Sequence, residues 1–221
     1  MRSFKDRADA GRKLATALAH YKGQRPVILA LPRGGVPVAA EIATRLEAPL
    51  DLVLVRKIGV PSQPELAMGA VVDGSSPIVV RNEEVIGLVG IDEKHFNAVR
   101  DRELAEIERR RQHYLGDRPR IELAGRVAIV VDDGVATGMT TRAALRSVAA
   151  RKPSKVVLAV PVAPTDAVAA LRREVDDLVC LETHENFYAI GLYYADFRQV
   201  SDDEVRLQLA QHLADAARNT K

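Results

Sequence analysis

The sequence predicts an α/β protein, with a parallel twisted sheet covered by helices on both faces. Several short segments are apolar at every position, and strands of this kind must be buried on both sides. They alternate along the chain with stretches whose apolar residues recur at helical intervals, the pattern of β–α–β units. The chain of 221 residues, 47% hydrophobic and 28% charged, predicts a single soluble domain over 1–221 with a sizeable core.

Composition and charge argue against a disulfide-stabilised, membrane-spanning, secreted or nucleic-acid-binding protein. The single Cys180 cannot form a disulfide within the chain. No apolar run approaches the roughly 20 residues of a membrane span, and the start at Met1 lacks the pattern of a secretory signal. We therefore expect a cytoplasmic protein with no membrane partner. The 32 Lys and Arg residues nearly balance 30 Asp and Glu, and no long basic run concentrates them, which argues against nucleic acid as a partner.

Helix and strand signals follow one another closely in the first part of the chain. Leu14, Leu18 and Tyr21 recur at helical spacing, and Gly23 can end that helix. The next helix must end before Pro49, because proline pushes the preceding residue out of the helical region. The expected order is helix, strand, turn, helix and strand, at 5–22, 27–31, 32–35, 38–46 and 52–55.

The middle of the chain departs from the β–α–β alternation. The turn residues 73–76 separate two apolar runs, 68–72 and 77–80, which predicts a hairpin. Residues 92–116 carry many charges and only a thin apolar stripe, so we expect a long, half-exposed helix there. We interpret the region of about 92–118 as a helical insertion.

The buried pattern then resumes. Thr165 and Asp166 are expected to cap one helix, and Ser201 with Glu204 to cap the last. The expected elements are strand 127–131, helix 140–150, strand 156–162, helix 165–173, strand 178–181 and a final helix that opens at 201–204. Ligands bind beyond the carboxyl ends of such parallel strands, so these ends are the places to search for a site.

The segment after strand 127–131 carries the most informative pattern. Two adjacent acids, Asp132 and Asp133, precede a short loop that opens a helix: Gly134, Val135, Ala136, Thr137, Gly138, Met139 and Thr140. The unpaired backbone N–H groups of such a loop, in front of a helix dipole, favour a phosphate. The acids cannot serve the same phosphate and need hydroxyls or a metal, so a ribose 5-phosphate fits both halves. Adjacent acids at a strand end also occur as a solvated turn or a helix cap.

The run Val130-Val131-Asp132-Asp133-Gly134-Val135-Ala136-Thr137-Gly138-Met139-Thr140 resembles the phosphoribosyl-pyrophosphate motif of type I phosphoribosyltransferases. The resemblance implies the fold of that family and a Mg²⁺ ion that arrives with phosphoribosyl pyrophosphate. It implies that Asp132 and Asp133 hold the ribose hydroxyls and reach the metal, if at all, through water. It further implies that Ala136 to Thr140 wrap the 5-phosphate, with Gly134 and Val135 also among the substrate-binding residues.

Two more strand ends carry residues that suit phosphate. Pro32-Arg33-Gly34-Gly35 is similar to the family's pyrophosphate loop, in which Arg33 offers a forked donor and the two glycines allow unusual backbone angles. Arg56 and Lys57 resemble the Arg-Lys pair that contacts pyrophosphate in adenine phosphoribosyltransferases. The following residues, 62–69, correspond in this resemblance to the mobile loop that closes over the reacting centre. Each segment taken alone is also an ordinary turn or a solvent-facing charge pair.

The sequence departs from the family pattern at the proton-transfer group. Hypoxanthine–guanine enzymes carry an acid where this chain has Ala136. Adenine enzymes have alanine there but draw a glutamate from the mobile loop, near the position of Ala67. Glu65 lies two residues from that position and is the candidate for this role.

The acceptor site is less well marked. Five of the nine aromatic residues fall within 182–200, which we interpret as a small hood: Phe187, Tyr188, Tyr193, Tyr194 and Phe197. Such a cluster can stack on a planar base, with His184, Glu185 and Asn186 beside it, or it can pack the hood itself.

The sequence therefore indicates a Mg²⁺-dependent phosphoribosyltransferase that acts on phosphoribosyl pyrophosphate and a small nitrogenous acceptor. A second hypothesis is a non-catalytic protein of the same fold that binds phosphoribosyl pyrophosphate or a nucleotide and has a regulatory role. A metal-dependent phosphohydrolase would need further acids at other strand ends. The oligomeric state stays open, with a homodimer as one candidate.

Overall fold

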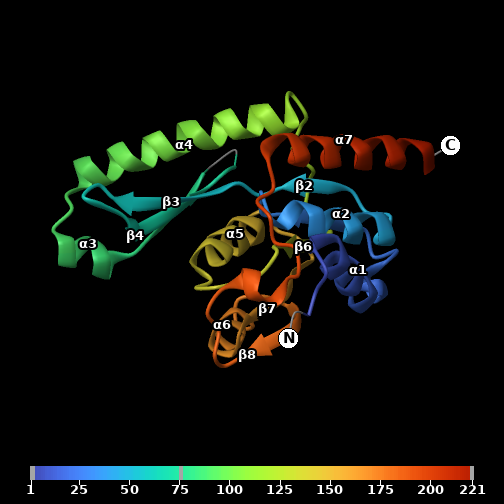
Figure 1. Cartoon of the computed structure of the whole chain (residues 1–221). Helices are drawn as coiled ribbons and strands as arrows, with labels where there is room; N and C mark the ends of the chain where they lie inside the picture. Colours follow the sequence, from blue (N-terminus) through green and yellow to red (C-terminus); the bar gives the residue numbers. More distant parts are fainter. Residues whose placement is uncertain (1–2, 75–76, 220–221) are drawn as a thin grey trace.

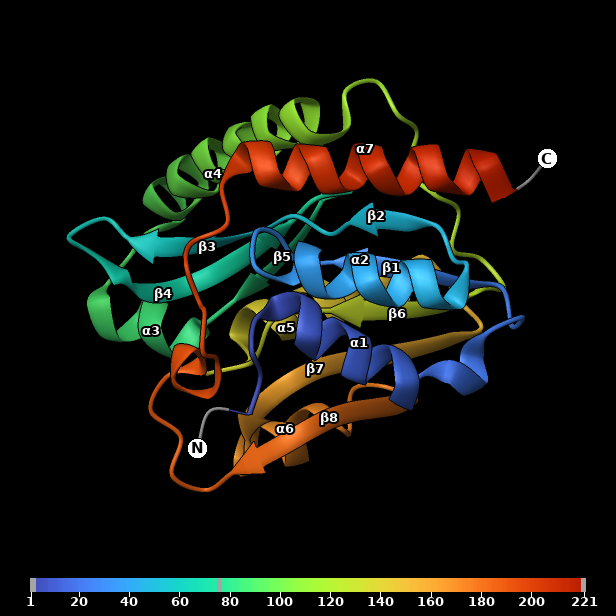
Figure 2. The ribbon, with the colours of Figure 1, turned by 45° about the vertical axis from the view of Figure 1, so that its right-hand side comes forward.

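The computed structural model describes residues 3–74 and 77–219, and for 215–219 the backbone alone. Its central layer is a five-stranded parallel sheet in the order β2-β1-β6-β7-β8 (Figures 1 and 2). The strands are β1 Pro26–Ala30, β2 Leu50–Leu52, β6 Val127–Val131, β7 Lys155–Pro164 and β8 Asp177–His184. The covering helices are α1 Arg7–Ala17, α2 Gly35–Leu46, α5 Met139–Ala150 and α6 Thr165–Leu171. A short 3₁₀ turn, Ala19–Tyr21, follows α1.

Alternate residues of the strands face two separate apolar cores. Ile28 and Ile129 pack with α1 and α2 on one face, and the side chains of Val130 and Leu158 pack with α5 and α6 on the other. Figure 2 shows the two helix pairs on opposite sides of the sheet. Burial on both sides is what continuous apolar strands require, and the predicted fold class is confirmed.

The prediction of a single strand over 52–55 is wrong. β2 ends at Leu52, and a new strand, β3 Val55–Val60, begins in a different, antiparallel sheet with β4 Gln63–Val72 and β5 Ile78–Arg81. The chain leaves the first sheet here because the Leu54 N–H donates to the Asp73 carboxylate at 2.9 Å instead of to a neighbouring parallel strand. Apolar character alone could not distinguish one long strand from two short ones.

The β4–β5 pairing confirms the predicted hairpin. Val72 lies opposite Ile78 in the antiparallel register, and part of the predicted turn, 75–76, lies outside the described residues. The segment 62–69, expected to be a mobile loop, instead supplies part of the turn and the first residues of β4 in the β3–β4 hairpin, in which Val60 pairs with Gln63. A hairpin that projects from the sheet can still cover a site, but its backbone is held by ladder hydrogen bonds.

The long charged helix is confirmed as α4, Glu93–Leu115, preceded by the short α3, Glu83–Val89. Asp92 caps α4 by accepting the His95 N–H at 2.8 Å. The thin apolar stripe that includes Phe96, Val99 and Ile107 is buried against the three-stranded sheet. In Figure 1 α4 runs along the outer face of β3 and β4.

The last part of the chain adds β8 to the sheet and ends in a helix that packs against α2 and α4. Thr165 does not cap α6, because the helix already includes it and Pro164 occupies the N-cap without a side-chain bond. The predicted cap of the last helix, α7 Asp202–Asn219, is confirmed, since Ser201 and Glu204 exchange side-chain-to-backbone bonds of 3.1 and 2.7 Å. Among the helices of the described residues, none is long and apolar enough to cross a membrane.

Candidate functional site

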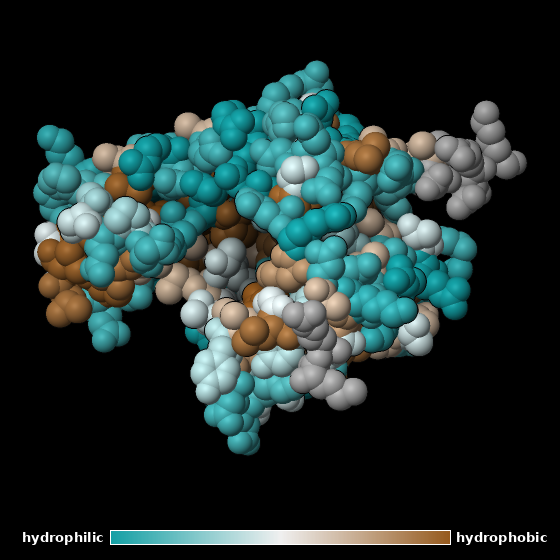
Figure 3. Space-filling view, viewed as in Figure 1, coloured by the Kyte–Doolittle hydropathy of each residue, from teal (hydrophilic) through white to brown (hydrophobic). Residues whose placement is uncertain are grey.

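The candidate site lies at the carboxyl ends of β1 and β6, which are neighbours in the sheet. Ala30 pairs with Val131 at the ends of the two strands, and the Leu31 N–H donates to the Val131 carbonyl at 2.9 Å. The loop 32–35 and the loop 132–138 therefore start side by side. Figure 3 shows this face of the molecule hollowed between the part built from α4, β3 and β4 and the rest of the chain.

Two glycines allow the loops to touch. A Cβ on Gly34 would lie 2.0 Å from Oδ2 of Asp133, and a Cβ on Gly35 would lie 2.7 Å from the Val131 carbonyl oxygen. No other residue type leaves room for this approach. The peptide bond between Pro32 and Arg33 is cis. The structure thus brings the two predicted loops together, and it assigns the glycines a packing role that the sequence did not reveal.

The acid pair has defined partners. The Arg7 Nε, from the first turn of α1, lies 2.7 Å from Oδ2 of Asp133, and both side chains are nearly buried. The Tyr194 hydroxyl donates to the Asp133 carbonyl at 2.6 Å. Asp132 accepts the N–H of Asp133 at 2.8 Å through its own Oδ1. The carboxylates are therefore held in place before any ligand arrives.

Burial and like charge raise the pKa of both acids. For Asp132 burial is the larger cause, and the neighbouring Asp133 adds to it, so its pKa lies well above the ordinary range. Burial also raises the pKa of Asp133, against the opposing charge of Arg7. The pKa of the Tyr194 hydroxyl is raised mainly by burial, which keeps it a donor. Two crowded carboxylates of this kind favour a ligand that brings hydroxyl donors or a cation.

The loop beyond the acids presents unpaired donors. The Val135 N–H is bonded to the Val162 carbonyl at 3.0 Å, and Gly138 takes a left-handed conformation with φ of +75° before α5 begins. Across the described residues, no backbone N–H from Ala136 to Thr141 has a protein acceptor. Thr137 and Thr140 are exposed on this loop. Consecutive free amides at the start of a helix, here the twelve-residue α5, are a common setting for binding an anion.

Arg56 and Lys57 lie on opposite faces of β3, because neighbouring residues of a strand alternate. Arg56 turns to α4, where its guanidinium meets the Glu103 carboxylate at 2.7 Å. Lys57 is exposed and lies 3.1 Å from Glu65 across the β3–β4 hairpin. The two cations therefore have different carboxylate partners, and Lys57 is paired with Glu65, the candidate for proton transfer.

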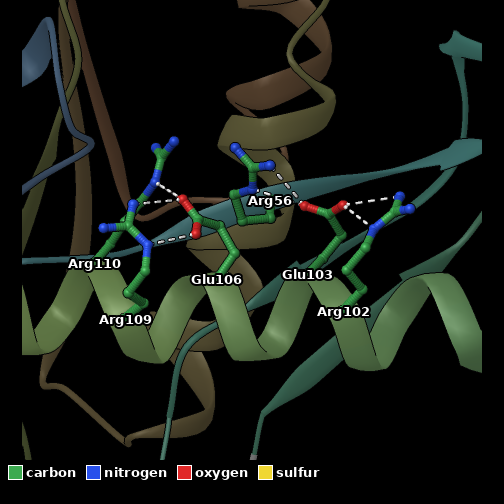
Figure 4. Close-up of polar contacts among 6 residues, drawn as sticks. All are labelled: Arg56, Arg102, Glu103, Glu106, Arg109 and Arg110. Carbon is green, nitrogen blue, oxygen red and sulfur yellow. Dashed lines mark hydrogen bonds and ion pairs between the residues drawn. The ribbon is translucent and has the colours of Figure 1, made fainter.

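A charged cluster runs along α4 beside this hairpin (Figure 4). Glu103 lies between Arg56 and the exposed Arg102, while Glu106 contacts both Arg109 and Arg110 at 2.7 Å. A cavity of about 390 Å³ opens between the hairpin and α4, with walls that include Arg56, Lys57, Glu65 and Glu103. The predicted leaving-group cations, Arg56 and Lys57, thus line a cavity between the β3–β4 hairpin and α4.

Glu103→Gln is expected to lower the free energy of unfolding by about 1–3 kcal/mol. The Glu103 side chain is 10% exposed and accepts from Arg56, so the neutral variant leaves a partly buried guanidinium without its counter-charge. Glu106→Gln is the matched control, because its partners lie on the same helix and such pairs are each worth about 0.3–0.5 kcal/mol. Urea denaturation of both variants measures the difference, and equal losses would contradict the assigned role of Glu103.

Arg33, in the loop after β1, makes an ion pair with the start of α7. Its guanidinium lies 3.7 Å from Asp202, the first residue of α7, and Asp202 also accepts the Tyr114 hydroxyl of α4 at 2.6 Å. Burial, then Asp202, raises the pKa of Tyr114 to about 12, so this hydroxyl stays protonated. The network joins the 32–35 loop to the two helices beyond it.

Most aromatic side chains of the 182–200 segment, which we call the hood, pack against one another or against Phe4. Tyr194 is 2% exposed and packs on Phe4, with Phe197 beside it. Tyr193 stacks between His184 and Phe187 at centroid distances of 4.4 and 5.2 Å, whereas Tyr188 is exposed. Ile190, in the 3₁₀ turn Ile190–Tyr193, packs against Gly134 and so covers the start of the phosphate-type loop.

Sequence reasoning missed Arg7, Glu103 and Asp202 as partners of predicted site residues. Arg7 and Asp133 are 126 positions apart. Nothing in a charged first helix turn marks one arginine as buried, so no local pattern could have found that pair. Glu103 and Asp202 are likewise joined to the site only by the tertiary fold.

The parallel sheet with helices on both faces, and the acid pair and glycine loop at the end of β6, define an α/β protein that carries a phosphoribosyl-pyrophosphate motif. The family model for the phosphoribosyl transferase domain matches residues 4–198, and the chain belongs to this family. The resemblance predicted from the motif is confirmed.

Relatives support the same assignment. The crystal structure of TT1426 from Thermus thermophilus is 42% identical, with a TM-score of 0.80, and the match covers 96% of this chain and 99% of that one. Two Mycobacterium tuberculosis proteins, from strains CDC 1551 and H37Rv, are named provisionally as phosphoribosyl transferases. Each is 49% identical over 205 residues, or 93% of this chain. The chain spans about half the length of these curated relatives, 46% in each case.

Proposed function

We propose that this chain transfers the 5-phosphoribosyl group of phosphoribosyl pyrophosphate to a small nitrogenous acceptor. One observation carries the proposal: the two acids and the six free amides of Ala136–Thr141 follow one another at the end of β6. A ligand that fits both must carry hydroxyls a few ångströms from a phosphate. Family membership supports the same proposal.

In the proposed reaction the acceptor nitrogen forms a bond to the anomeric carbon, and the bond from that carbon to pyrophosphate breaks with its electron pair. The amides of the 136–141 segment hold the 5-phosphate. Asp132 and Asp133 accept hydrogen bonds from the ribose hydroxyls and stabilise the positive charge that develops on the sugar. Arg33 binds the leaving pyrophosphate, with Lys57 and Arg56 on the hairpin side.

The proton that the acceptor nitrogen loses passes to Glu65 or to water. Glu65 is exposed on the β3–β4 hairpin, 3.1 Å from Lys57, and is the carboxylate that we assign to this step. Ala136 offers no group for this step. The hairpin also limits access of water to the activated ribose.

The residues present fit a magnesium ion that arrives with the substrate. Within the described part of the chain no cluster of three or more His, Cys, Asp or Glu forms a protein cage for a metal. Mg²⁺ is commonly held by one or two carboxylates, several waters and substrate phosphates, and Asp132 and Asp133 would contribute through water. When bound, the ion neutralises the charge of the leaving pyrophosphate.

The test is to incubate the protein with phosphoribosyl pyrophosphate, Mg²⁺ and a panel of nitrogenous bases. Pyrophosphate release and the mass of a new nucleotide are followed together. The expected result is stoichiometric release of pyrophosphate with one acceptor. Absence of binding to phosphoribosyl pyrophosphate would overturn the proposal.

A second function, a regulatory protein that binds phosphoribosyl pyrophosphate or a nucleotide without turnover, is favoured by one feature. Ala136 lacks a proton-transfer group, and the remaining candidate, Glu65, is already paired with Lys57. In the same experiment, tight binding with no product across the whole panel would support this function instead.

A further inference from the structure

We infer that Arg7 is a positioning residue for the ribose of the substrate, and that it acts through Asp133. This inference rests on the proposed function and deepens it. Arg7 comes from α1, far from the motif in sequence, yet its Nε lies 2.7 Å from Oδ2 of Asp133. The two side chains are only 11% and 12% exposed. A charge-assisted bond of this kind opposes the effect of burial on the carboxylate and restricts its rotamer.

Arg7 is itself held from several sides. Its guanidinium lies 3.9 Å from the centroid of the Phe197 ring, and its Nη1 donates to the Arg198 carbonyl at 2.8 Å. Cation–π contact and backbone acceptance leave the guanidinium little freedom to turn away. These contacts therefore hold the Arg7 guanidinium in the orientation in which its Nε meets Asp133.

The hood and the N-terminal segment form one unit around this arginine. Phe4 and Tyr194 make an isolated parallel bridge, in which the Ala195 N–H donates to the Phe4 carbonyl at 2.8 Å. The Asp196 N–H donates to the Lys5 carbonyl at the same distance. The hood also supplies the Tyr194 hydroxyl that fixes the Asp133 backbone. Residues from the two ends of the family match thus converge on a single motif acid.

Arg7 engages one oxygen of the Asp133 carboxylate, Oδ2, which is also the oxygen nearest Gly34. In the inferred complex a ribose hydroxyl therefore approaches Oδ1. Asp132 has no arginine partner among the described residues and keeps more of its surface exposed than Asp133 does. Loss of Arg7 would leave two crowded acids without a counter-charge, so one of them would turn or take up a proton. In either case the hydroxyl acceptor is lost while the phosphate amides stay in place.

The test compares two probes on Arg7→Met and Arg7→Lys. Binding of ribose 5-phosphate and of inorganic phosphate is measured by calorimetry, and thermal unfolding is recorded in parallel. For Arg7→Met we expect ribose 5-phosphate to bind about 10-fold more weakly or worse, with inorganic phosphate nearly unchanged. Arg7→Lys, which keeps the charge, should recover part of the loss. Arg12→Met, also on α1, is the control, because it removes only an exposed pair with Glu41 of α2.

The outcomes separate this inference from the proposed function. Equal weakening of both probes, or unchanged binding of ribose 5-phosphate in a folded Arg7→Met variant, would overturn the positioning role. If Arg7→Met does not fold, the same comparison is made with Arg7→Lys and Tyr194→Phe, whose expected losses are smaller but again confined to the sugar-bearing probe. A wild-type protein that binds neither probe would instead overturn the proposed function, and the inference with it.

Discussion

Asp132→Asn is expected to weaken binding of ribose 5-phosphate and phosphoribosyl pyrophosphate by about 10- to 100-fold, with the fold intact. The loss follows from replacing a charged acceptor by a neutral one, a change worth about 1.5–3 kcal/mol. Asparagine keeps an Oδ1 that can still accept the Asp133 N–H, which lies 2.8 Å from the Asp132 carboxylate. The substitution also removes one of two crowded like charges, so the melting temperature should stay the same or rise.

Asp203→Asn is the matched control for this change, because its carboxylate is 90% exposed at the start of α7. It should alter neither affinity nor stability by a measurable amount. Calorimetry of both variants measures the affinities, and a thermal melt checks the fold. Unchanged affinity in Asp132→Asn would mean that the acid pair only forms a turn. The double variant Asp132→Asn with Asp133→Asn should bind ribose at least as weakly.

Gly35→Ala is expected to have the largest effect on stability. Its Cβ would lie 2.7 Å from the Val131 carbonyl oxygen and 3.0 Å from the Cα of Asp132, both of them backbone atoms. Val131 is fixed on two sides, because it pairs with Ala30 in β1 and with Ala159 in β7. Overpacking against backbone that cannot move costs about 1–3 kcal/mol or more. For a chain of this size that is a fall in melting temperature of roughly 2–4 °C per kcal/mol.

The same substitution should also weaken ribose 5-phosphate binding, since any relaxation must displace the start of the acid pair. Gly87→Ala in α3 is the control, because no atom lies within 4 Å of its would-be Cβ. Alanine there should stabilise the helix by about 0.5–1 kcal/mol. A Gly35→Ala variant as stable as the wild type would contradict the close approach of the two loops.

The sequence allowed the central sheet and the juxtaposition of the loops that follow β1 and β6 to be predicted. Val127–Val131 is apolar at every position and flanked by turn residues, so its bounds could be predicted to the residue. The candidate site was chosen by a physical rule, because parallel strands bring their carboxyl ends to one edge of a sheet. The helical periodicity found α4, whose buried stripe is thin but regular.

The parts that could not be predicted depend on contacts distant in the chain. The apolar run 52–55 divides between two sheets because of a bond from Leu54 to Asp73, and nothing in the run itself indicates the break. Arg56 and Lys57 look like one cationic pair until the strand places them on opposite faces. Arg7 meets Asp133 in a region where the N-terminal segment also pairs with residue 194, and these contacts join residues far apart in the chain.

The most direct test of the phosphate site is an NMR titration of the isotope-labelled protein with ribose 5-phosphate. We predict that the largest shifts of backbone amide resonances fall on Ala136–Thr141, with smaller shifts at Asp132 and Asp133. Inorganic phosphate should move the first group alone. Saturable binding that leaves the resonances of 136–141 unmoved, with shifts elsewhere in the chain, would contradict the claim that these amides hold the phosphate.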